Sequence, residues 1–155
     1  MPILELDKTD RKILALLQED GRMTNADLAQ RISLSPSACL RRVQRLEETA
    51  VISGYVALVR QEAVGRPTSI FVEVTLKSQS EEALKAFERA VRVCPDIMEC
   101  YLMSGDADYL IRVVAADTQD YERIHKQHLT RLPGVARIRS SFALRAISKK
   151  TALDI

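Results

Sequence analysis

The spacing of apolar residues changes once along the chain, and this change restricts the folds open to it. Over residues 6–50 apolar side chains recur at every third or fourth position, which predicts α-helices, whereas from residue 69 an alternating pattern of strands also appears. A chain of 155 residues is long enough for two small domains. We therefore predict an α+β protein with one domain over residues 1–53, an extended strand or linker over 54–67 and a second domain over 68–155.

The first domain is predicted to contain three helices with recognisable starts. Asp7, Thr24 and Ser35 are residues that cap helix N-termini, and Asp27 follows Thr24 at the spacing of a capping box. Pro36 stands at the first position of the third helix, where its missing N–H costs nothing. A short helix, a tight turn and a longer helix are typical of a helix-turn-helix.

The third helix is predicted to have an apolar face and a basic face. On a helical wheel Leu40, Val43 and Leu46 share one side, which we expect to face the core. The opposite side is basic, and small residues at the helix start would let it approach a duplex. The candidate DNA contacts are Ser35, Ser37, Ala38, Arg41, Arg42 and Arg45. Arginines attract phosphates and grip guanine. Three arginines alone would favour a solvated face, but together with the cap and the turn spacing they favour DNA binding.

The second domain is predicted to have the order βαββαβ, the ferredoxin-like arrangement. Its expected elements are a strand over 69–76, a helix over 80–94, strands over 97–104 and 109–115, a helix from Asp117 to Leu132 and a last strand over 135–147. A Gly-Asp-Ala-Asp turn separates the two middle strands and indicates a hairpin.

Composition excludes several classes of protein. A net charge of +2 is too small for the whole chain to be a nucleic-acid binder, so that role must rest on a local patch. The three cysteines form no CxxC pair and are expected to be reduced thiols, with no metal site. No secretory signal and no apolar run long enough for a membrane span is present, so we expect a cytoplasmic protein without a membrane partner.

Asp106 and Asp108 in the hairpin have several possible roles. A catalytic pair is not favoured, because no Ser/His/Asp or Cys/His pattern lies nearby, and the spacing of a calcium loop is absent. At least one aspartate is expected to shape the turn. The other would suit the ammonium of an amino acid, with Gly105 and Ser140 as donors for its carboxylate. We favour Asp108 as the ligand contact and Asp106 as the turn former; we predict no catalytic residue and no cofactor.

The stretch "LDKTDRKILALLQEDGRMTNADLAQRISLSPSACLRRVQRLEETAVISGY" resembles the N-terminal domain of the Lrp/AsnC family of leucine-responsive and asparagine-responsive transcription regulators. "SGDADYL" and "LTRLPGVARIRSSFAL" resemble its amino-acid-sensing domain. The resemblance implies a winged helix-turn-helix that binds double-stranded operator DNA, a ferredoxin-like effector domain, and homodimers that often assemble into octamers. The implied effector region is Leu102, Gly105, Asp106, Asp108, Ser140 and Ser141.

The sequence departs from the family pattern at four positions. Ala50 stands where a glycine usually precedes the "VI" after the third helix, and glycine adopts a left-handed cap more cheaply. Ala107 replaces a residue that is commonly aromatic, which leaves space beside the effector. Ser140 replaces a threonine, and Arg41 adds a charge where relatives are often acidic or neutral. Changes in ligand choice and operator preference are therefore expected.

Three functions follow from these observations. The first is a DNA-binding transcription regulator whose oligomeric state or DNA affinity responds to an amino acid. The second is an enzyme acting on a tetrapyrrole, because sirohaem decarboxylases resemble this family in fold and His125 or His128 would be available to them. Packed or interfacial histidines are the favoured interpretation of that pair. The third is a sensor that no longer binds DNA. The arginines of the third helix favour the regulator.

Overall fold

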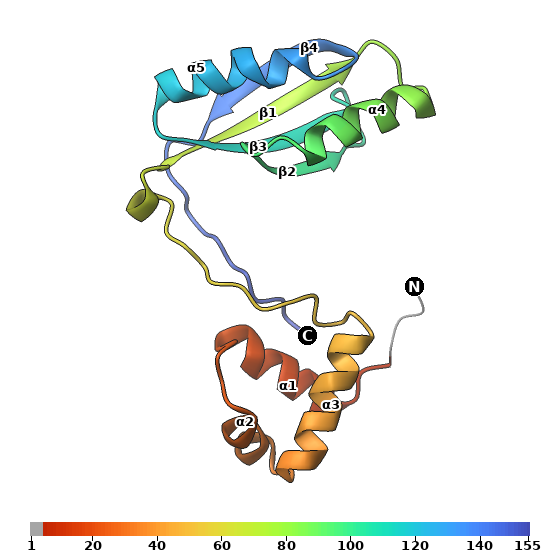
Figure 1. Ribbon diagram of the computed structural model, residues 1–155, viewed down its shortest axis with the longest axis vertical. Helices are drawn as coiled ribbons and strands as arrows, with labels where there is room; N and C mark the ends of the chain where they lie inside the picture. Colours follow the sequence, from red (N-terminus) through yellow and green to blue (C-terminus); the bar gives the residue numbers. More distant parts are fainter. Residues whose placement is uncertain (1–4) are drawn as a thin grey trace. The chain divides into compact units, whose positions relative to one another are not determined.

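The structure is a computed structural model that describes residues 5–155; residues 1–4 of the expected first domain lie outside the described residues. The chain divides into two compact units, shown with their elements in Figure 1. The first, called unit 1 below, comprises the chain up to Leu58 together with Ile147–Ile155. Unit 2 comprises Val59–Ala146.

Unit 1 contains helices α1 (Lys8–Glu19), α2 (Asn25–Ile32) and α3 (Pro36–Glu48), as the caps predict. The side chains of Asp7, Thr24 and Ser35 accept hydrogen bonds from the backbone N–H three residues later. The N–H of Asp27 donates to the Thr24 hydroxyl at 3.1 Å, and the Asp27 carboxylate accepts a 2.7 Å hydrogen bond from the same hydroxyl. These local bonds satisfy N–H groups that a helix start leaves unpaired.

The core of unit 1 corrects one expectation about α3. Cys39 and Leu46 are completely buried, whereas the Leu40 side chain is 45% exposed. The stripes through Cys39 and through Leu40 both fit a helical period, because the two residues are neighbours and both stripes share Val43 and Leu46. The packing of α1 and α2 against α3 selects the Cys39 stripe and leaves Leu40 facing outward.

A left-handed cap ends α3, although the sequence places alanine there. Ala50 has φ = 56°, and its N–H donates to the Glu47 carbonyl at 2.9 Å, the 5→2 bond of a Schellman motif. The N–H of Ile52 donates to the Leu46 carbonyl at 3.0 Å and closes the end of the helix. From Thr49 to Pro67 the described chain forms the short 3-10 helix η1 (Glu62–Val64) and no hydrogen-bonded strand. The strand expected within residues 54–67 is therefore unpaired in the single chain.

Unit 2 has the predicted order βαββαβ. Its elements are β1 (Thr68–Leu76), α4 (Glu81–Arg92), β2 (Ile97–Leu102), β3 (Tyr109–Ala115), α5 (Thr118–Gln127), the 3-10 helix η2 (Leu129–Arg131) and β4 (Val135–Phe142). The strands form one antiparallel sheet in the order β2-β3-β1-β4. The helix expected to reach Leu132 changes to 3-10 geometry after Gln127, and the last strand ends at Phe142 rather than 147.

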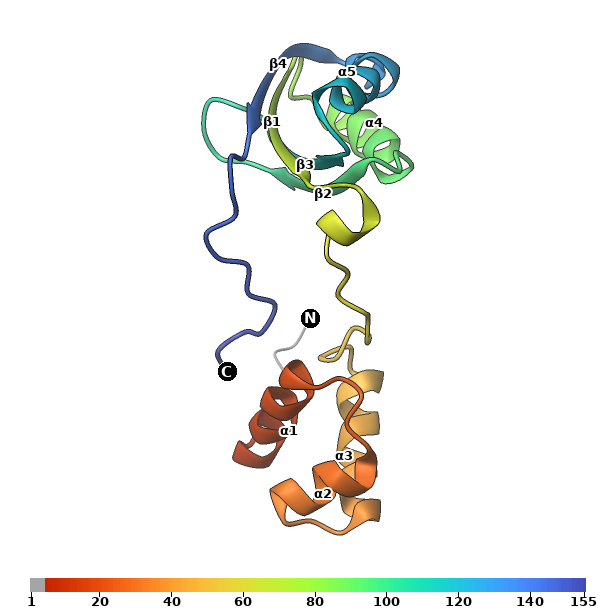
Figure 2. The same cartoon turned by 90° about the vertical axis from the view of Figure 1, so that its left-hand side faces the viewer.

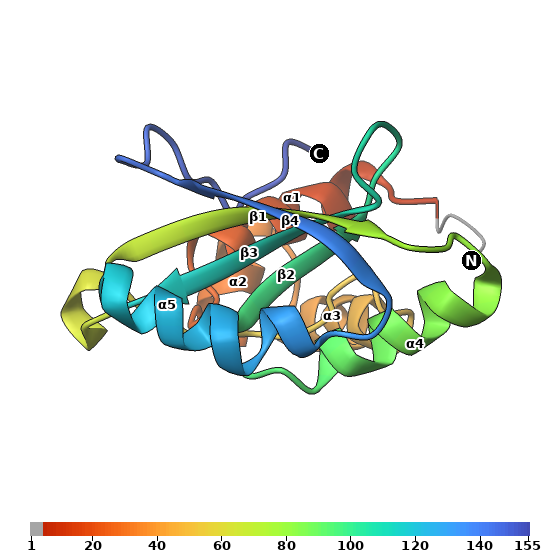
Figure 3. The same cartoon turned by 90° about the horizontal axis from the view of Figure 1, so that it is seen from above.

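The sheet of unit 2 has one covered face and one face without helices. Figures 2 and 3 show α4 and α5 packed on the same side of the sheet. Alternate residues of β1 and β3 point into that side, and Ile70, Val72 and Ile111 are completely buried there. Phe71, Glu73 and Thr75 of β1 point to the other side, which we call the open face. Within the described residues no helix covers it.

We expect Ala50→Gly to stabilise unit 1. An alanine in the left-handed conformation destabilises the fold by about 1–2 kcal/mol, which glycine avoids. Glycine loses roughly 0.5–1 kcal/mol of this advantage, because it has more conformational freedom in the unfolded chain. The net gain of about 0.5–1 kcal/mol should raise the unfolding transition of this small unit by a few degrees in calorimetry. Ala15→Gly, at an exposed position inside α1, is the matched control and should lower the transition. An unchanged or lower transition in Ala50→Gly would contradict the expectation.

Candidate functional site

The outward face of α3 is formed by a stripe of exposed side chains. Ser37, Leu40, Arg41 and Gln44 are all exposed and recur at helical spacing. Two contacts fix the start of this helix: the Ser35 hydroxyl accepts from the N–H of Ala38 at 3.2 Å, and Asn25 donates to the Pro36 carbonyl at 2.9 Å. The turn between α2 and α3 is therefore rigidly set, and α3 offers a defined surface. Leu40 and Gln44 were not among the residues predicted from the sequence.

Arg42 and Arg45 do not belong to this stripe. Asp10 of α1 is completely buried, and its two carboxylate oxygens accept one bond from each arginine, at 2.8 Å from Arg42 and 2.5 Å from Arg45. Arg42 also bonds the carboxylate of Asp7 at 2.8 Å. The three arginines predicted as one basic face are thus divided, because Arg41 has no ion pair within residues 5–155.

The electrostatics of this cluster favour the charged forms of Arg42 and Asp7. Hydrogen bonds to Asp7 and then to Asp10 raise the pKa of Arg42. The N–H of Asp10, and then Arg42, hold the pKa of Asp7 below its usual range. A sequence signal for the cluster exists: Asp7 and Asp10 are three residues apart at the start of α1, so their side chains share one face. Only the packing of α1 on α3 shows which arginines they meet.

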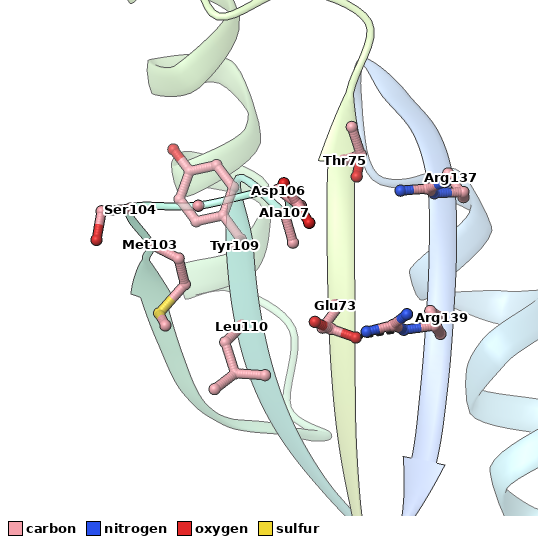
Figure 4. A pocket seen from close by; sticks show the side chains of 11 residues that line it. Glu73, Thr75, Met103, Ser104, Asp106, Ala107, Tyr109, Leu110, Arg137 and Arg139 are labelled. Carbon is pink, nitrogen blue, oxygen red and sulfur yellow. Dashed lines mark hydrogen bonds and ion pairs between the residues drawn. The ribbon is translucent and has the colours of Figure 1, made fainter.

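A pocket of about 270 Å³ lies at the β2–β3 hairpin on the open face (Figure 4). Its lining residues are Glu73, Thr75, Met103, Ser104, Gly105, Asp106, Ala107, Tyr109, Leu110, Arg137 and Arg139. Of the predicted effector region, Gly105 and Asp106 line it. Leu102, Asp108, Ser140 and Ser141 do not. The basic residues of β4 and the carboxylate of β1 were missed, because only strand pairing brings them to the hairpin.

Asp108 has a structural role in the hairpin. Its carboxylate accepts a 2.7 Å bond from the N–H of Leu76, and Gln79 lies 3.4 Å away. Its own N–H donates to the Val74 carbonyl at 3.0 Å. These contacts tie the hairpin to the end of β1. The structure therefore gives Asp108 the local role that the sequence interpretation assigned to Asp106, and leaves Asp106 exposed at the pocket.

The predicted serines of β4 lie elsewhere on the sheet. Ser140 pairs with Val72 and points to the helix-covered face, where its hydroxyl is 2.5 Å from that of Tyr121. Ser141 pairs with Phe71 and lies on the open face, but does not reach the pocket. The side chain of a strand residue alternates between faces, so the adjacent serines cannot serve one site.

Charges of both signs meet in the pocket. Glu73 and Arg139 form a 2.5 Å ion pair across β1 and β4, and Figure 4 shows the two side chains pointing at each other. Glu73 chiefly, with a smaller effect of Asp106, raises the pKa of Arg139. Arg137 has no ion pair among the described residues and stands beside Thr75. Met103 and Leu110 add apolar surface. This combination suits a small molecule that carries both charges and an apolar group.

The two histidines and Cys100 lie in packing contacts within unit 2. The Nε2 of His128 lies 3.4 Å from a carboxylate oxygen of the buried Asp96. The rings of His125 and Tyr121 are in an edge contact, with their centroids 6.1 Å apart. Residues 5–155 contain no cluster of three or more His, Cys, Asp or Glu side chains suited to a metal ion. Burial, and secondarily Glu88, raises the pKa of the Cys100 thiol to about 11. None of the helices described is both long and apolar enough to cross a membrane.

Comparisons with known proteins connect both sites to one family. Residues 6–47 match the model of the AsnC-type helix-turn-helix domain, and residues 69–153 match that of the Lrp/AsnC ligand binding domain. The Bkd operon transcriptional regulator of Pseudomonas aeruginosa is 44% identical over 96% of this chain and 97% of its own length. The leucine-responsive regulatory protein of Escherichia coli K12 is 38% identical over 99% of this chain and 94% of its own.

Solved structures agree with these matches along almost the whole chain. A transcriptional regulator from Neisseria meningitidis, in complex with L-Met, superposes with a TM-score of 0.90 at 37% identity, covering 97% of both chains. An AsnC family regulator from Agrobacterium tumefaciens superposes with a TM-score of 0.91 at 40% identity, covering 96% of this chain and 97% of its own. Fold, domain order and sequence identity thus point to one conclusion: the chain belongs to the Lrp/AsnC family of transcription regulators.

Proposed function

We propose that this protein regulates transcription by binding operator DNA through α3 and an amino acid through the hairpin pocket of unit 2. The observation that carries the DNA-binding role is the outward stripe of α3, with a rigidly capped start and an arginine without an ion pair among the described residues. A helix of this kind fits the major groove of duplex DNA. Membership of the Lrp/AsnC family supports the same role.

The proposed DNA contacts have different tasks. Ser35, Ser37 and Ala38 lie at the N-terminus of α3, where small side chains and backbone N–H groups allow a close approach to phosphate or base edges. Arg41 lies one turn further on and supplies a fixed cation. Arg42 and Arg45 were candidates as well, but their ion pairs with α1 give them another role, which is developed below.

The pocket is proposed to bind an amino acid by its two charged groups. Asp106 would face the ammonium, because its carboxylate is exposed at the pocket whereas that of Asp108 is bonded to β1. Arg137 would face the carboxylate, because Arg139 is already paired with Glu73. Met103 and Leu110 would contact the side chain, and Ala107 leaves room for a larger one. The relative in complex with L-Met supports an amino acid as the ligand class.

Response to the effector is proposed to act through self-association. The open face exposes large apolar side chains, including Phe71 and Tyr101, which are typical of a surface that pairs with another copy. Homodimers that assemble further, to octamers as in the family, would present several α3 helices to DNA. An amino acid that binds better to one assembly than to another would shift the balance between them, which couples the two sites.

We also propose that the protein acts in the cytoplasm, where regulators like its bacterial relatives meet DNA, and without catalysis. The rival role, an enzyme acting on a tetrapyrrole, would recruit His125 or His128. Both lie in the contacts of α5 described above, with Asp96 and Tyr121 as their neighbours. Purified protein that retains a tetrapyrrole would show a strong visible absorption band. Such a band, accompanied by turnover of the bound pigment, would overturn the proposal.

The effector role predicts different outcomes for the two aspartates of the hairpin. Ligand binding raises the stability of the native state by RT ln(1 + [L]/Kd), so a thermal-shift screen of the twenty amino acids should give a hit. Asp106→Asn should abolish the shift without lowering the melting temperature of the free protein. Asp108→Asn should lower that temperature, because Asp108 ties β1 to the hairpin. A ligand shift that survives Asp106→Asn at full size would remove Asp106 from the site.

The DNA-binding role predicts an effect of Arg41→Ala on salt dependence. Removal of one phosphate-binding cation should flatten the slope of log K against log salt by about 0.9. The slope would be measured by fluorescence anisotropy on a duplex recovered by selection from random sequences with the wild-type protein. Lys85→Ala, on the surface of α4 in unit 2, is a control that removes one exposed positive charge far along the chain. An equal slope in Arg41→Ala and wild type would exclude Arg41 as a phosphate contact.

A further inference from the structure

We propose that Asp10 is a positioning residue for DNA recognition, which holds Arg42 and Arg45 as a bracket between α1 and α3. In this arrangement the two arginines set the angle of α3 and do not bind phosphate, while Arg41 binds phosphate and Leu40 and Gln44 read the sequence. The proposal rests on the proposed function of α3 as the DNA-binding helix. It assigns separate tasks to adjacent arginines that the sequence alone presents as one basic face.

Burial of Asp10 is the first reason. Its side chain has no exposed surface, yet it is a carboxylate, and a buried carboxylate is tolerated only when it is paired and hydrogen-bonded. Arg42 supplies one oxygen with a donor at 2.8 Å, and Arg45 supplies the other at 2.5 Å. If either arginine turned toward a phosphate, one buried oxygen would lose its donor. Binding of DNA that draws these arginines away from Asp10 would therefore work against the packing of α1.

The second reason is that the cluster is continuous and neutral. Asp7 caps α1 by accepting from the N–H of Asp10 at 2.8 Å with one oxygen, and its other oxygen accepts from Arg42 at 2.8 Å. The bonds form a continuous path from the helix cap of α1 to the middle of α3. Two arginines face two aspartates, so the cluster has no excess positive charge to attract DNA. It joins residues 32 and 35 positions apart in the chain.

The third reason is the position of the stripe itself. Leu40, Arg41 and Gln44 are exposed, and within residues 5–155 neither Arg41 nor Gln44 has a hydrogen-bond or ion-pair partner. The three side chains offer different contacts: the guanidinium of Arg41 for phosphate, the amide of Gln44 for adenine and the apolar group of Leu40 for the thymine methyl. The side chains of Arg42 and Arg45 are 31% and 47% exposed, and both are bonded to Asp10. The stripe therefore has the variety and the freedom that base reading requires.

The decisive experiment compares Arg42→Gln with Arg41→Gln, the same substitution one position apart. Glutamine removes the charge but still donates a hydrogen bond, so Arg42→Gln retains a partner for Asp10 and favours a folded protein. DNA binding would be measured over a range of salt on the full-length protein, with a duplex selected by the wild type and a random duplex of equal length. Circular dichroism melting would follow stability in parallel.

The proposal expects Arg41→Gln to flatten the salt slope by about 0.9 and to leave the melting temperature unchanged. Arg42→Gln should leave the slope unchanged and lower the melting temperature. Equal flattening of the slope by both substitutions would overturn the bracket, while DNA binding by α3 would stand. Wild-type protein that shows no salt-dependent binding to any selected duplex would instead overturn the proposed function, so the two failures are distinct.

Asp10→Asn provides a second, opposite test. It removes one of the two negative charges that face the arginines and leaves the cluster with one excess positive charge, because Asp7 still pairs with Arg42. Binding to the random duplex should therefore gain a steeper salt slope and higher affinity. Asp27→Asn, which removes an exposed carboxylate of α2, is the matched control for the change of one charge. A selection repeated with Gln44→Ala should lose preference at one base position. An unchanged slope in Asp10→Asn, or unchanged base preference in Gln44→Ala, would contradict the assignment.

Discussion

The packing of α1 against α3 in unit 1 depends on one completely buried carboxylate, that of Asp10. Asp10 is placed on the first turn of α1, and its ionised side chain is stable there only because Arg42 and Arg45 reach it from α3. Apolar packing through Cys39 and Leu46 is not directional and would tolerate a range of helix angles. Two ion pairs of fixed geometry narrow that range, and they do so at the helix that presents the outward stripe. Stability and orientation are thus linked in one cluster.

The hairpin of unit 2 depends on a similar division between neighbouring residues of like charge. Asp108 is used by the fold, since its carboxylate accepts the N–H of Leu76 at the end of β1. Asp106, two residues earlier, does not hold β1 in this way, and its side chain lines the pocket. In both units one charged residue is held by packing while its close neighbour faces outward. Residue type alone therefore does not separate structural from binding charges.

Across residues 5–155 two surfaces of the single chain are uncovered, and both are suited to the self-association typical of the Lrp/AsnC family. The open face of the sheet exposes Phe71 and Tyr101, and the segment between α3 and β1 forms no hydrogen-bonded strand within the described residues. Apolar groups and unpaired strand edges of this kind are suited to association with further copies. The pocket lies on that same open face, so an amino acid bound there would be well placed to influence association.

The sequence by itself determined the helices, their caps and the order βαββαβ, because a cap acts through a bond three positions away and a strand alternates with a period of two. Only the tertiary structure decided which side chains share a site. The pairing of Arg42 and Arg45 with Asp10 depends on where α1 packs. Likewise, Arg137 reaches the hairpin through the register of β4 on β1, whereas Ser140 is turned to the other face. These contacts join residues tens of positions apart, and a local pattern of spacing contains no information on such pairs.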